Sequence, residues 1–365
     1  MDADGERQYF IQFIRANPRA KLGVGEASAS HLLNQLSFSK QLQRGISNGI
    51  SPDYRGIYMA ITIERCYEQA TWDRVGRQTN ADHPEYSPQN VFWPVHATPE
   101  NTGVNLSLIA SLKGQPVGRL QRRGKCLLEV SVAPGQRRRG VGTALVEFAV
   151  EDAKEHGLEH VHVITIDEAD QSLTGFFDHL GFVRYATFSM LADLAEPIPA
   201  ATLAQCRRLL SQGFKSRVLD KDVAADLALV IQLQARYFPG YPGFMSEAEM
   251  VRLVLERGQI AMVLEQGSQV AGFIIGGIDT TLKNGRFVRC EGYGLLGSIA
   301  TSEEFRKMGV ASTIMCEFVK LLKERGINHM LYGGCGPEGN ASRRVAQSVG
   351  ARHEVRHFNF VKEVN

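Results

Sequence analysis

The chain of 365 residues is long enough for two domains of ordinary size. Its formal net charge of +2 argues against a broad basic surface of the kind that binds nucleic acid. Hydrophobic residues make up 44% of the chain, which suffices for packed cores. We expect no membrane segment, because no apolar stretch is long enough and the acidic N-terminus lacks a signal-peptide core. The six widely spaced cysteines predict free thiols and a cytoplasmic protein.

The first half of the chain becomes readable after residue 95. Before it, helical patterns occur near residues 9–14 and 31–42, residues 55–72 contain one strand or helix, and residues 79–90 indicate a loop. Alternating strand and helix patterns then predict strands at 106–111, 116–120, 127–132 and 161–166, helices at 143–156 and 172–180, and a last strand through Phe188.

The second half repeats this order after a linker. Residues 194–212 contain two prolines and a short helical run near 203–210, which is typical of a connection between domains. The elements that follow are a hairpin of strands at 260–264 and 270–275, strands at 295–301 and 327–332, and helices at 312–325 and 340–349.

The two halves are related by an internal repeat. Arg137–Gly142 recurs as Arg306–Ala311, and this displacement along the chain defines the repeat offset. The same offset relates three further pairs: Gly157 and Gly326, His160 and His329, and Gly181 and Gly350. The offset is a domain length rather than a solenoid repeat. We therefore predict a first domain at 1–193 with an N-terminal extension, a linker at 194–212 and a second domain at 213–365.

Each copy places a basic, glycine-containing loop between a strand and a helix. Free backbone N–H groups and the positive end of the helix dipole favour an anion there, above all a phosphate. Arg137, Arg138 and Arg139 add positive charge, and Gly140 and Gly142 allow close approach of the backbone. The alternative to an anion site is an ordinary basic turn exposed to solvent. The occurrence of the loop in both copies makes this alternative less favoured.

These loops resemble the acyl-CoA signature of the GNAT N-acyltransferase superfamily, Gln/Arg-x-x-Gly-x-Gly/Ala. The resemblance covers about residues 103–190 and 258–355, and the second copy departs from it where Gly350-Ala351 replaces Gly-Phe. It implies an α/β fold with a mixed α+β sheet in two tandem GNAT-like domains, and acetyl-CoA as the acyl donor.

The resemblance also implies the residues that bind coenzyme A. Loop amides would hold the pyrophosphate, and strand backbone would hold the pantetheine. In the first copy these are Val130, Val132, Arg137, Arg138, Arg139, Gly140, Val141, Gly142 and Thr143. In the second copy they are Ile299, Thr301, Arg306, Lys307, Met308, Gly309, Val310, Ala311, Ser312 and Asn340.

Acyl transfer to an amine needs a base and a polarised thioester carbonyl. Glu129, one strand step from Val130, is the candidate base, although a solvent-facing strand glutamate would look the same. Candidates in the second copy are Glu291, Tyr293 and Tyr332. We expect one copy to react, and the complete strand–helix order of residues 214–365 favours the second.

Both copies depart from the family at the general acid. Many GNAT enzymes carry a tyrosine before the last Gly-Phe, where this chain has Phe176-Phe177 and Val345-Ala346. Either another hydroxyl serves, such as that of Tyr185 or Tyr332, or the thiolate leaves unaided, because its pKa is only about 8.5.

Three other motifs have simpler explanations. Gly292–Gly297 matches G-x-G-x-x-G but runs into a strand, so a dinucleotide site is not expected. His160 and His162 share a strand face without further metal ligands in sequence, and we predict no metal site. Cys335 has no identifiable base and is interpreted as a chance thiol.

The sequence thus predicts an acetyltransferase that uses acetyl-CoA. We expect the acceptor to be a primary amine on a small metabolite, since the charge is near neutral and a cleft between the copies suits a small ligand. The alternatives are a protein-lysine acetyltransferase and an acyl-CoA-binding sensor or scaffold without catalysis.

Overall fold

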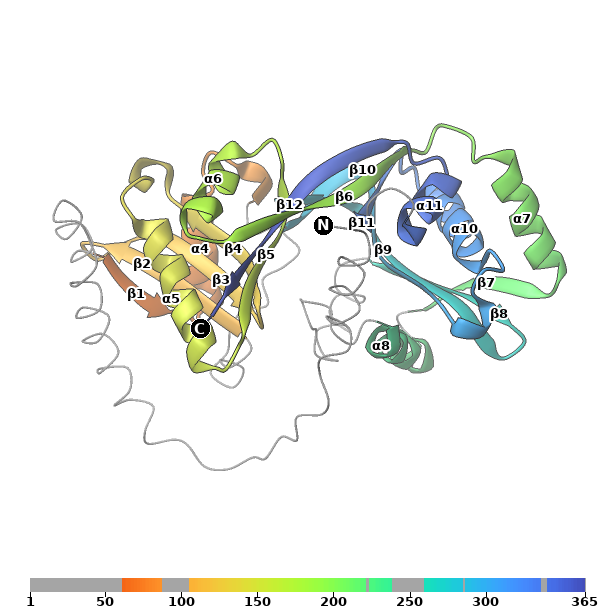
Figure 1. The fold of residues 1–365 in the computed structure, drawn as a ribbon, viewed down its shortest axis with the longest axis horizontal. Coiled ribbons are helices and arrows are strands. Elements are labelled where there is room, and N and C mark those ends of the chain that lie inside the picture. The colour runs from red at the N-terminus through yellow and green to blue at the C-terminus, as the bar shows by residue number, and fades with distance from the viewer. Residues whose placement is uncertain are drawn as a thin grey trace, which may run out of the picture.

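The computed structural model describes residues 61–86, 105–220, 223–237, 259–284, 286–335 and 340–364. The first half (Figure 1) contains strands β1 (Ile61–Arg65), β2 (Asn105–Leu112), β3 (Gln115–Arg123), β4 (Cys126–Val132), β5 (His160–Asp167) and β6 (Val183–Asp193). The second half contains strands β7 (Phe214–Val218), β8 (Ile260–Gln266), β9 (Gln269–Lys283), β10 (Arg286–Thr301), β11 (His329–Cys335) and β12 (His353–Glu363). The α-helices are α4 (Gln69–Thr79), α5 (Val141–Glu155), α6 (Gln171–His179), α7 (Ala200–Ser211), α8 (Ala224–Tyr237), α10 (Val310–Glu324) and α11 (Ala341–Ser348). Short 3-10 helices are η1 (Pro84–Tyr86), η3 (Pro134–Gln136) and η4 (Glu303–Phe305).

The repeat offset holds for whole elements. It carries both ends of α5 onto those of α10 and both ends of η3 onto those of η4. The G-x-G-x-x-G sequence lies within β10, which confirms that it is a strand. The prediction of one element at 55–72 is wrong, because β1 ends and α4 begins within it. The helical patterns expected near residues 9–14 and 31–42 lie outside the described residues.

The two halves share one sheet of 12 strands in the order β1-β2-β3-β4-β5-β12-β6-β11-β10-β9-β8-β7. The last strand of each half lies beside the penultimate strand of the other half. β12 pairs with β5 on one side and β6 on the other, and β6 continues the sheet to β11. The long crossing strands β6 and β12 form the bridge between the halves (Figure 1). Neither half therefore completes its sheet with its own chain alone.

The pairing of β6 with β12 is symmetric under the repeat. Thr187 pairs with His357, and Phe188 pairs with Arg356. The repeat offset carries Thr187 onto Arg356 and Phe188 onto His357, so the two pairs exchange. The copies are thus related by a pseudo-twofold axis at this point, as in an isologous dimer.

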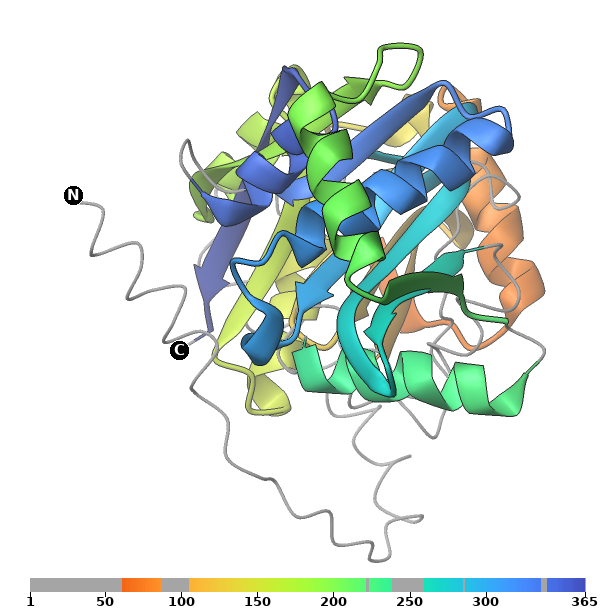
Figure 2. The ribbon, with the colours of Figure 1, turned by 90° about the vertical axis from the view of Figure 1, so that its right-hand side faces the viewer.

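Helices cover both faces of the sheet within each half. In the second half, alternate residues of β8 face opposite clusters, with Met262 toward α7, α10 and α11 and Val263 toward α8. Figure 2 shows α7 and α8 on opposite sides of this end of the sheet. The first half follows the same rule, because Leu108 packs with α5 and α6 whereas Ile109 packs with α4. None of the helices in the described ranges combines the length and apolarity needed to cross a bilayer.

The hairpin of β9 and β10 is longer than its counterpart in the first half. β9 has 15 residues against 9 in β3, and β10 has 16 against 7 in β4. Its tip reaches the first half, where Lys283 forms an ion pair with Glu85 at 2.7 Å. The side chain of Asn284 donates to the hydroxyl of Tyr86 at 3.2 Å. This extension brings second-half residues to the site described next.

The segment predicted as a linker carries α7, which packs on the second half. The hydroxyl of Thr202 donates to the carbonyl of Ser348 at the end of α11 at 2.6 Å, and Leu209 is fully buried in the core with α10. The domain boundaries themselves stay a prediction, and the shared sheet means that each domain borrows a strand from the other.

Candidate active site at the split between β4 and β5

The parallel strands β4 and β5 separate after two residue pairs. Cys126 pairs with His162 and Leu127 with Val163, and the pairing ends there. The register of β4 against β3 shifts at the same place, which leaves Leu128 as a bulge. A bulge turns a strand away from its neighbour, so the split follows from the local geometry of β4. The second half repeats the arrangement at the repeat offset, with a bulge at Gly297.

Backbone groups of β4 line the split. The N–H of Ala133 donates to the carbonyl of Val117 on β3. Since backbone groups alternate along a strand, those of Val130 and Val132 face the split instead. Their carbonyls are contacted by arginine side chains: Arg137 Nε donates to Val132 O at 3.0 Å and Arg286 Nη2 to Val130 O at 3.5 Å.

The loop after β4 leads directly into α5. Gly140, with φ 79°, is the N-cap residue of α5, and no side chain caps the helix. Arg138 also has a positive φ of 62°. This left-handed turn leaves the N–H groups at the start of α5 as unpaired donors of the helix, which suits an anion. Arg138 and Arg139 are exposed beside it, whereas Arg137 forms a bidentate ion pair with Asp82 at 2.6 and 2.8 Å.

Glu129 is buried in an ion pair rather than exposed to solvent. Arg119 donates to its Oε1 from Nε at 2.9 Å and from Nη2 at 2.7 Å, and Ser131 Oγ donates at 3.2 Å. Burial would raise the pKa of Glu129, but the charges of Arg119 and Arg286 outweigh it and hold the pKa below its usual value. Glu129 is therefore a carboxylate at neutral pH, already engaged by a guanidinium.

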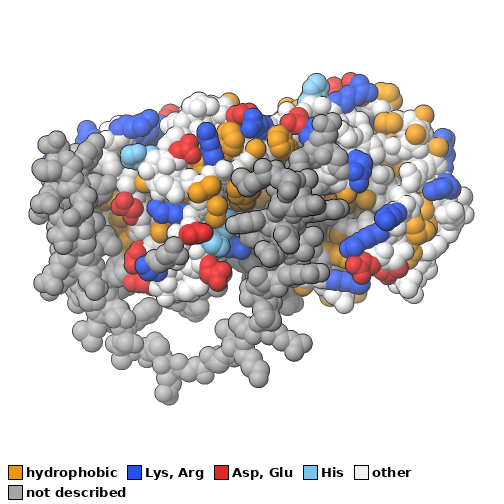
Figure 3. Space-filling view, viewed as in Figure 1, with side chains coloured by type: hydrophobic (Ala, Val, Ile, Leu, Met, Phe, Trp, Pro, Cys, Tyr) orange, Lys and Arg blue, Asp and Glu red, His pale blue; other side chains and the backbone are white. Residues whose placement is uncertain are grey.

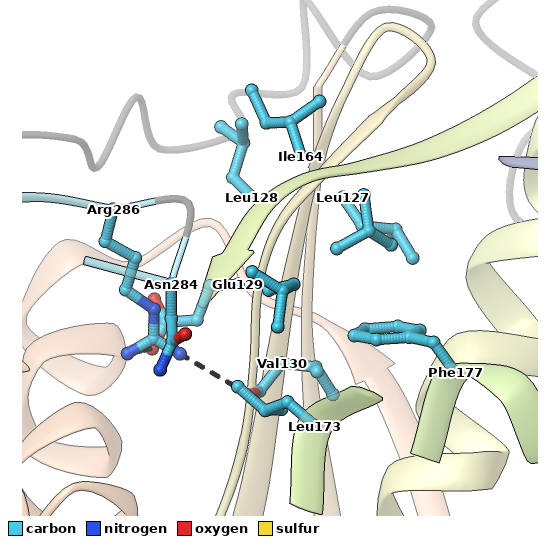
Figure 4. Close-up of a pocket in the computed structure, with 11 residues that line it drawn as sticks. Leu127, Leu128, Glu129, Val130, Ile164, Leu173, Phe177, Asn284 and Arg286 are labelled. Atoms are coloured by element: carbon cyan, nitrogen blue, oxygen red, sulfur yellow. Dashed lines mark hydrogen bonds and ion pairs between the residues drawn. The ribbon is translucent and has the colours of Figure 1, made fainter. Parts of the chain in front are cut away.

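Residues of both halves meet around this carboxylate (Figure 4). Arg286 from β10 places Nη1 3.6 Å from Glu129 Oε1, and its guanidinium stacks over the Tyr86 ring at 4.4 Å. Asn284 accepts from the N–H of Asp167 at 3.0 Å and donates to Asp170 at 2.9 Å. The small pocket at the split is lined by β4, β5, α6 and the hairpin tip: Leu127, Leu128, Glu129, Val130, Val163, Ile164, Ile166, Leu173, Phe177, Asn284 and Arg286.

Comparison with known proteins places this arrangement in one family. The sequence model described as the Acetyltransferase (GNAT) family matches residues 63–182 and 228–351, more than half of the chain. The chain belongs to the GNAT acetyltransferase family. One match falls in each half, which confirms the tandem organisation. No curated protein matches the chain in sequence.

Solved GNAT structures align with most of this chain at low identity. A fungal multi-domain GH3 β-N-acetylglucosaminidase with a GCN5-related glucosamine N-acetyltransferase region aligns with TM-score 0.60 at 16% identity, covering 83% of this chain but only 38% of that one. A tandem GNAT protein from the clavulanic acid biosynthesis pathway aligns with TM-score 0.53 at 16% identity, over 84% of this chain and 99% of that one. A GCN5-related N-acetyltransferase from Sphaerobacter thermophilus gives TM-score 0.51 at 16% identity, over 87% and 98%. The mixed α/β fold with two GNAT domains is confirmed.

The second GNAT loop is partly covered by α7. Gly309, with φ 95°, is the N-cap residue of α10, as Gly140 is of α5. Gln205 of α7 donates to the carbonyl of Met308 at 3.2 Å and fills the space beside Gly309, where a Cβ would lie 1.6 Å from its Nε2. Arg306 pairs with Glu303 at 3.2 Å. Arg306 and Lys307 are both exposed beside this loop.

The candidate catalytic residues of the second GNAT domain do not gather at its split. Glu291 is exposed, and the ring of Tyr293 contacts that of His329 on β11. Glu291 and Tyr293 both precede the bulge in β10. Tyr332 does lie at the split but is 2% exposed within the core, and burial raises its pKa. Ser298 stands where the offset places the counterpart of Glu129. Predicted Asn340 caps α11 by accepting from the N–H of Ser342 at 2.9 Å.

His162 and Cys335, for which the sequence predicted neither a metal site nor a catalytic thiol, are both buried. Burial lowers the pKa of His162 to about 4, so it is neutral at physiological pH. Burial raises the pKa of Cys335 to about 12, which disfavours a reactive thiolate. Within the described ranges, no group of three or more His, Cys, Asp and Glu side chains is arranged to hold a metal ion.

Sequence reasoning missed Arg119, Tyr86, Asn284 and Arg286. One signal was present in the sequence. The turn at Lys113 corresponds to the turn at Gly267, but these two turns are fewer residues apart than the corresponding loop residues Arg137 and Arg306. The second copy therefore has extra residues between its first turn and its loop. These residues form the longer hairpin, whose tip could reach the first domain.

Proposed function

We propose that the protein transfers an acetyl group from acetyl-CoA to a primary amine of a small metabolite, and that the first half carries out the reaction. The observation that carries this proposal is the succession of three features along one strand and helix. These are the carboxylate of Glu129, the split edge at Val130 and Val132, and the uncapped start of α5. This assignment reverses the expectation that the second copy reacts.

The first half is better suited to the acyl donor. The start of α5 offers unpaired N–H groups and the exposed side chains of Arg138 and Arg139 for a pyrophosphate. The N–H groups of Val130 and Val132 face the split, where they can pair with an extended donor or polarise its carbonyl. In the second half, Gln205 occupies space beside the corresponding loop, and Ser298 replaces the carboxylate.

The chemistry requires an acceptor nitrogen to lose a proton, to form a bond to the acyl carbon and to displace the thiolate. Glu129 is the described carboxylate at the pocket and is ionised at neutral pH, so it can take the proton directly or through water. Its low pKa makes it a weak base, which fits an acceptor that arrives partly deprotonated. Phe177 lines the pocket where the family tyrosine is missing, and a thiolate can leave unaided because its pKa is about 8.5.

A small acceptor fits the surface better than a nucleic acid or a membrane. On the face in Figure 3, basic and acidic side chains are interspersed over both halves rather than gathered by sign. The described cysteines are free, which is in keeping with our proposal of a cytoplasmic protein.

Turnover of acetyl-CoA with a panel of acceptors tests the proposal. Release of free thiol with small primary amines, and at most weak release with lysine-containing peptides, is the expected result. Stronger turnover with the peptides would favour a protein-lysine acetyltransferase. Coenzyme A binding without turnover of any acceptor would favour a sensor or scaffold, and absence of binding would contradict the proposal.

A further inference from the structure

We propose that Arg286 binds a carboxylate of the acceptor, so that the preferred substrates are amines that also carry a carboxylate, such as amino acids. This inference rests on the proposed function of the first half and narrows its substrate class. It arises from the excess positive charge at the pocket and from Nη1 of Arg286, which has no hydrogen-bond partner among the described residues.

The buried cluster at the pocket carries more positive than negative charge. Arg119 and Arg286 both face Glu129, but Arg119 alone makes close hydrogen bonds to it, at 2.7 and 2.9 Å. Asp167 and Asp170 are nearby but form their described contacts with other groups, because Asp167 contacts His357 at 2.9 Å and Asp170 accepts from Asn284 and from the first turn of α6. The described ion pairs of Arg119 and Arg286 go to Glu129 alone. Among the described residues, the carboxylate of Glu129 thus faces two guanidinium groups, and a second anion would balance the charge.

Arg286 has unused hydrogen-bonding capacity. Its side chain is 11% exposed, and its Nη1 atom is buried without a hydrogen-bond partner among the described residues. Its Nη2 makes only a long contact of 3.5 Å to the carbonyl of Val130. A buried donor without a partner is costly, whereas a carboxylate fits the fork of a guanidinium.

Arg286 is held in place at the point where an acceptor would have to bind. The Tyr86 ring supports its guanidinium, and Asn284 anchors the hairpin tip to β5 and α6. The guanidinium lies in the same pocket as Val130 and Phe177 (Figure 4). Since the proposed acyl donor lies along Val130, a carboxylate on Arg286 would leave a nearby amine of the same small molecule within reach of the thioester.

The test compares acceptors that differ only in this carboxylate. Amino acids and their carboxamides, such as L-alanine and L-alaninamide or L-lysine and L-lysinamide, are assayed with acetyl-CoA at equal concentrations of free amine. We expect wild-type kcat/KM to favour the carboxylates by about 10- to 100-fold, the range for a charged hydrogen bond. Arg286→Gln should reduce this preference to near unity, and Arg286→Lys should retain part of it because a charge remains.

Lys283→Gln is the matched control. It removes a charge and an ion pair from the same hairpin tip but does not line the pocket, so the ratio of carboxylate to carboxamide should not change. If Arg286→Gln does not fold, the preference for carboxylates is compared between Arg286→Lys and the wild type instead.

The outcomes separate this inference from the proposed function. Wild-type turnover that prefers the carboxamides, or a preference for carboxylates that Arg286→Gln retains, would overturn the role of Arg286 and leave the acetyltransferase intact. Coenzyme A binding that appears only in Arg286→Gln would also overturn it, because Arg286 would then block the cleft. Failure of the proposed function would instead appear as no turnover of either class by any of these proteins.

Discussion

Phe360, near the C-terminus, packs its ring against Phe177 of the first half, with ring centroids 5.5 Å apart. Phe360 lies on β12 and is fully buried in the cluster formed by β2, β3, α5 and α6. The last strand of the chain thus completes the core of the first domain, and folding of the candidate site depends on residues at the opposite end of the sequence.

Replacement of Phe360 should therefore destabilise the first half. Phe360→Ala removes a fully buried aromatic side chain, which costs about 3–5 kcal/mol. Urea unfolding followed by two probes, one in each half, should show the loss chiefly in the first half. Phe358→Ala on the same strand is the control, because Phe358 is only half-buried and should cost less. An unchanged midpoint for Phe360→Ala would contradict the exchange of strands.

The ion pair between Glu129 and Arg119 should be worth more to stability than an exposed pair. Glu129→Gln leaves two buried guanidinium groups facing a neutral amide, and we expect a loss of about 3–5 kcal/mol. Arg119→Met combined with Glu129→Gln should recover part of this loss, because one of the two isolated charges is removed. A double-mutant cycle from chemical unfolding measures the coupling. Additive losses would show that the two side chains do not interact.

The buried His162 should make stability fall in mild acid. Its pKa in the folded protein is lowered to about 4 from the ordinary value of 6.5. Between these values the unfolded chain binds a proton that the folded protein does not, so stability is present above pH 6.5 and is lost as the pH falls. The slope should be about 1.4 kcal/mol per pH unit.

Unfolding free energies measured from pH 8 to pH 5 check the expectation for His162. His162→Gln should flatten the slope, whereas His179→Gln should not, since His179 is exposed. A slope that survives in His162→Gln would assign the effect to another group.

The repeat, the loops and most elements could be predicted because their signals are local. The strand pattern ending at Val132, the turn at Gly140 and the helix that follows are written in consecutive residues, and the second copy repeats all three at the same offset.

The exchange of β6 and β12 could not be predicted from the sequence. The offset between the two copies is the same whether the last strand of each half pairs within its own half or with the other half. Strand pairing joins residues that are far apart in the sequence, so local patterns do not predict it. Arg119 was missed for a related reason. A polar residue that alternates with apolar ones predicts a solvent-facing side chain. Arg119 is instead buried, because it pairs with Glu129, donates to the carbonyl of Trp72 and lies against Gly76, which has no Cβ to clash with it. Arg286 meets Glu129 only through the hairpin extension.

The most direct test of the central claim, that the first half binds acetyl-CoA and reacts, is a matched pair of charge reversals. Arg138 and Lys307 are related by the repeat, are both exposed and have φ values of 62° and 66°. Arg138→Glu and Lys307→Glu therefore place the same side chain at equivalent points of the two loops, with comparable effects on folding that melting transitions check.

Coenzyme A affinity by titration calorimetry and turnover of acetyl-CoA are measured for both variants. We predict that Arg138→Glu weakens binding and lowers kcat/KM by about 10-fold or more, because repulsion replaces attraction at the phosphate site. Lys307→Glu should change both by less than about 3-fold. Loss of activity in Lys307→Glu with full activity in Arg138→Glu would contradict the account and assign the reaction to the second half.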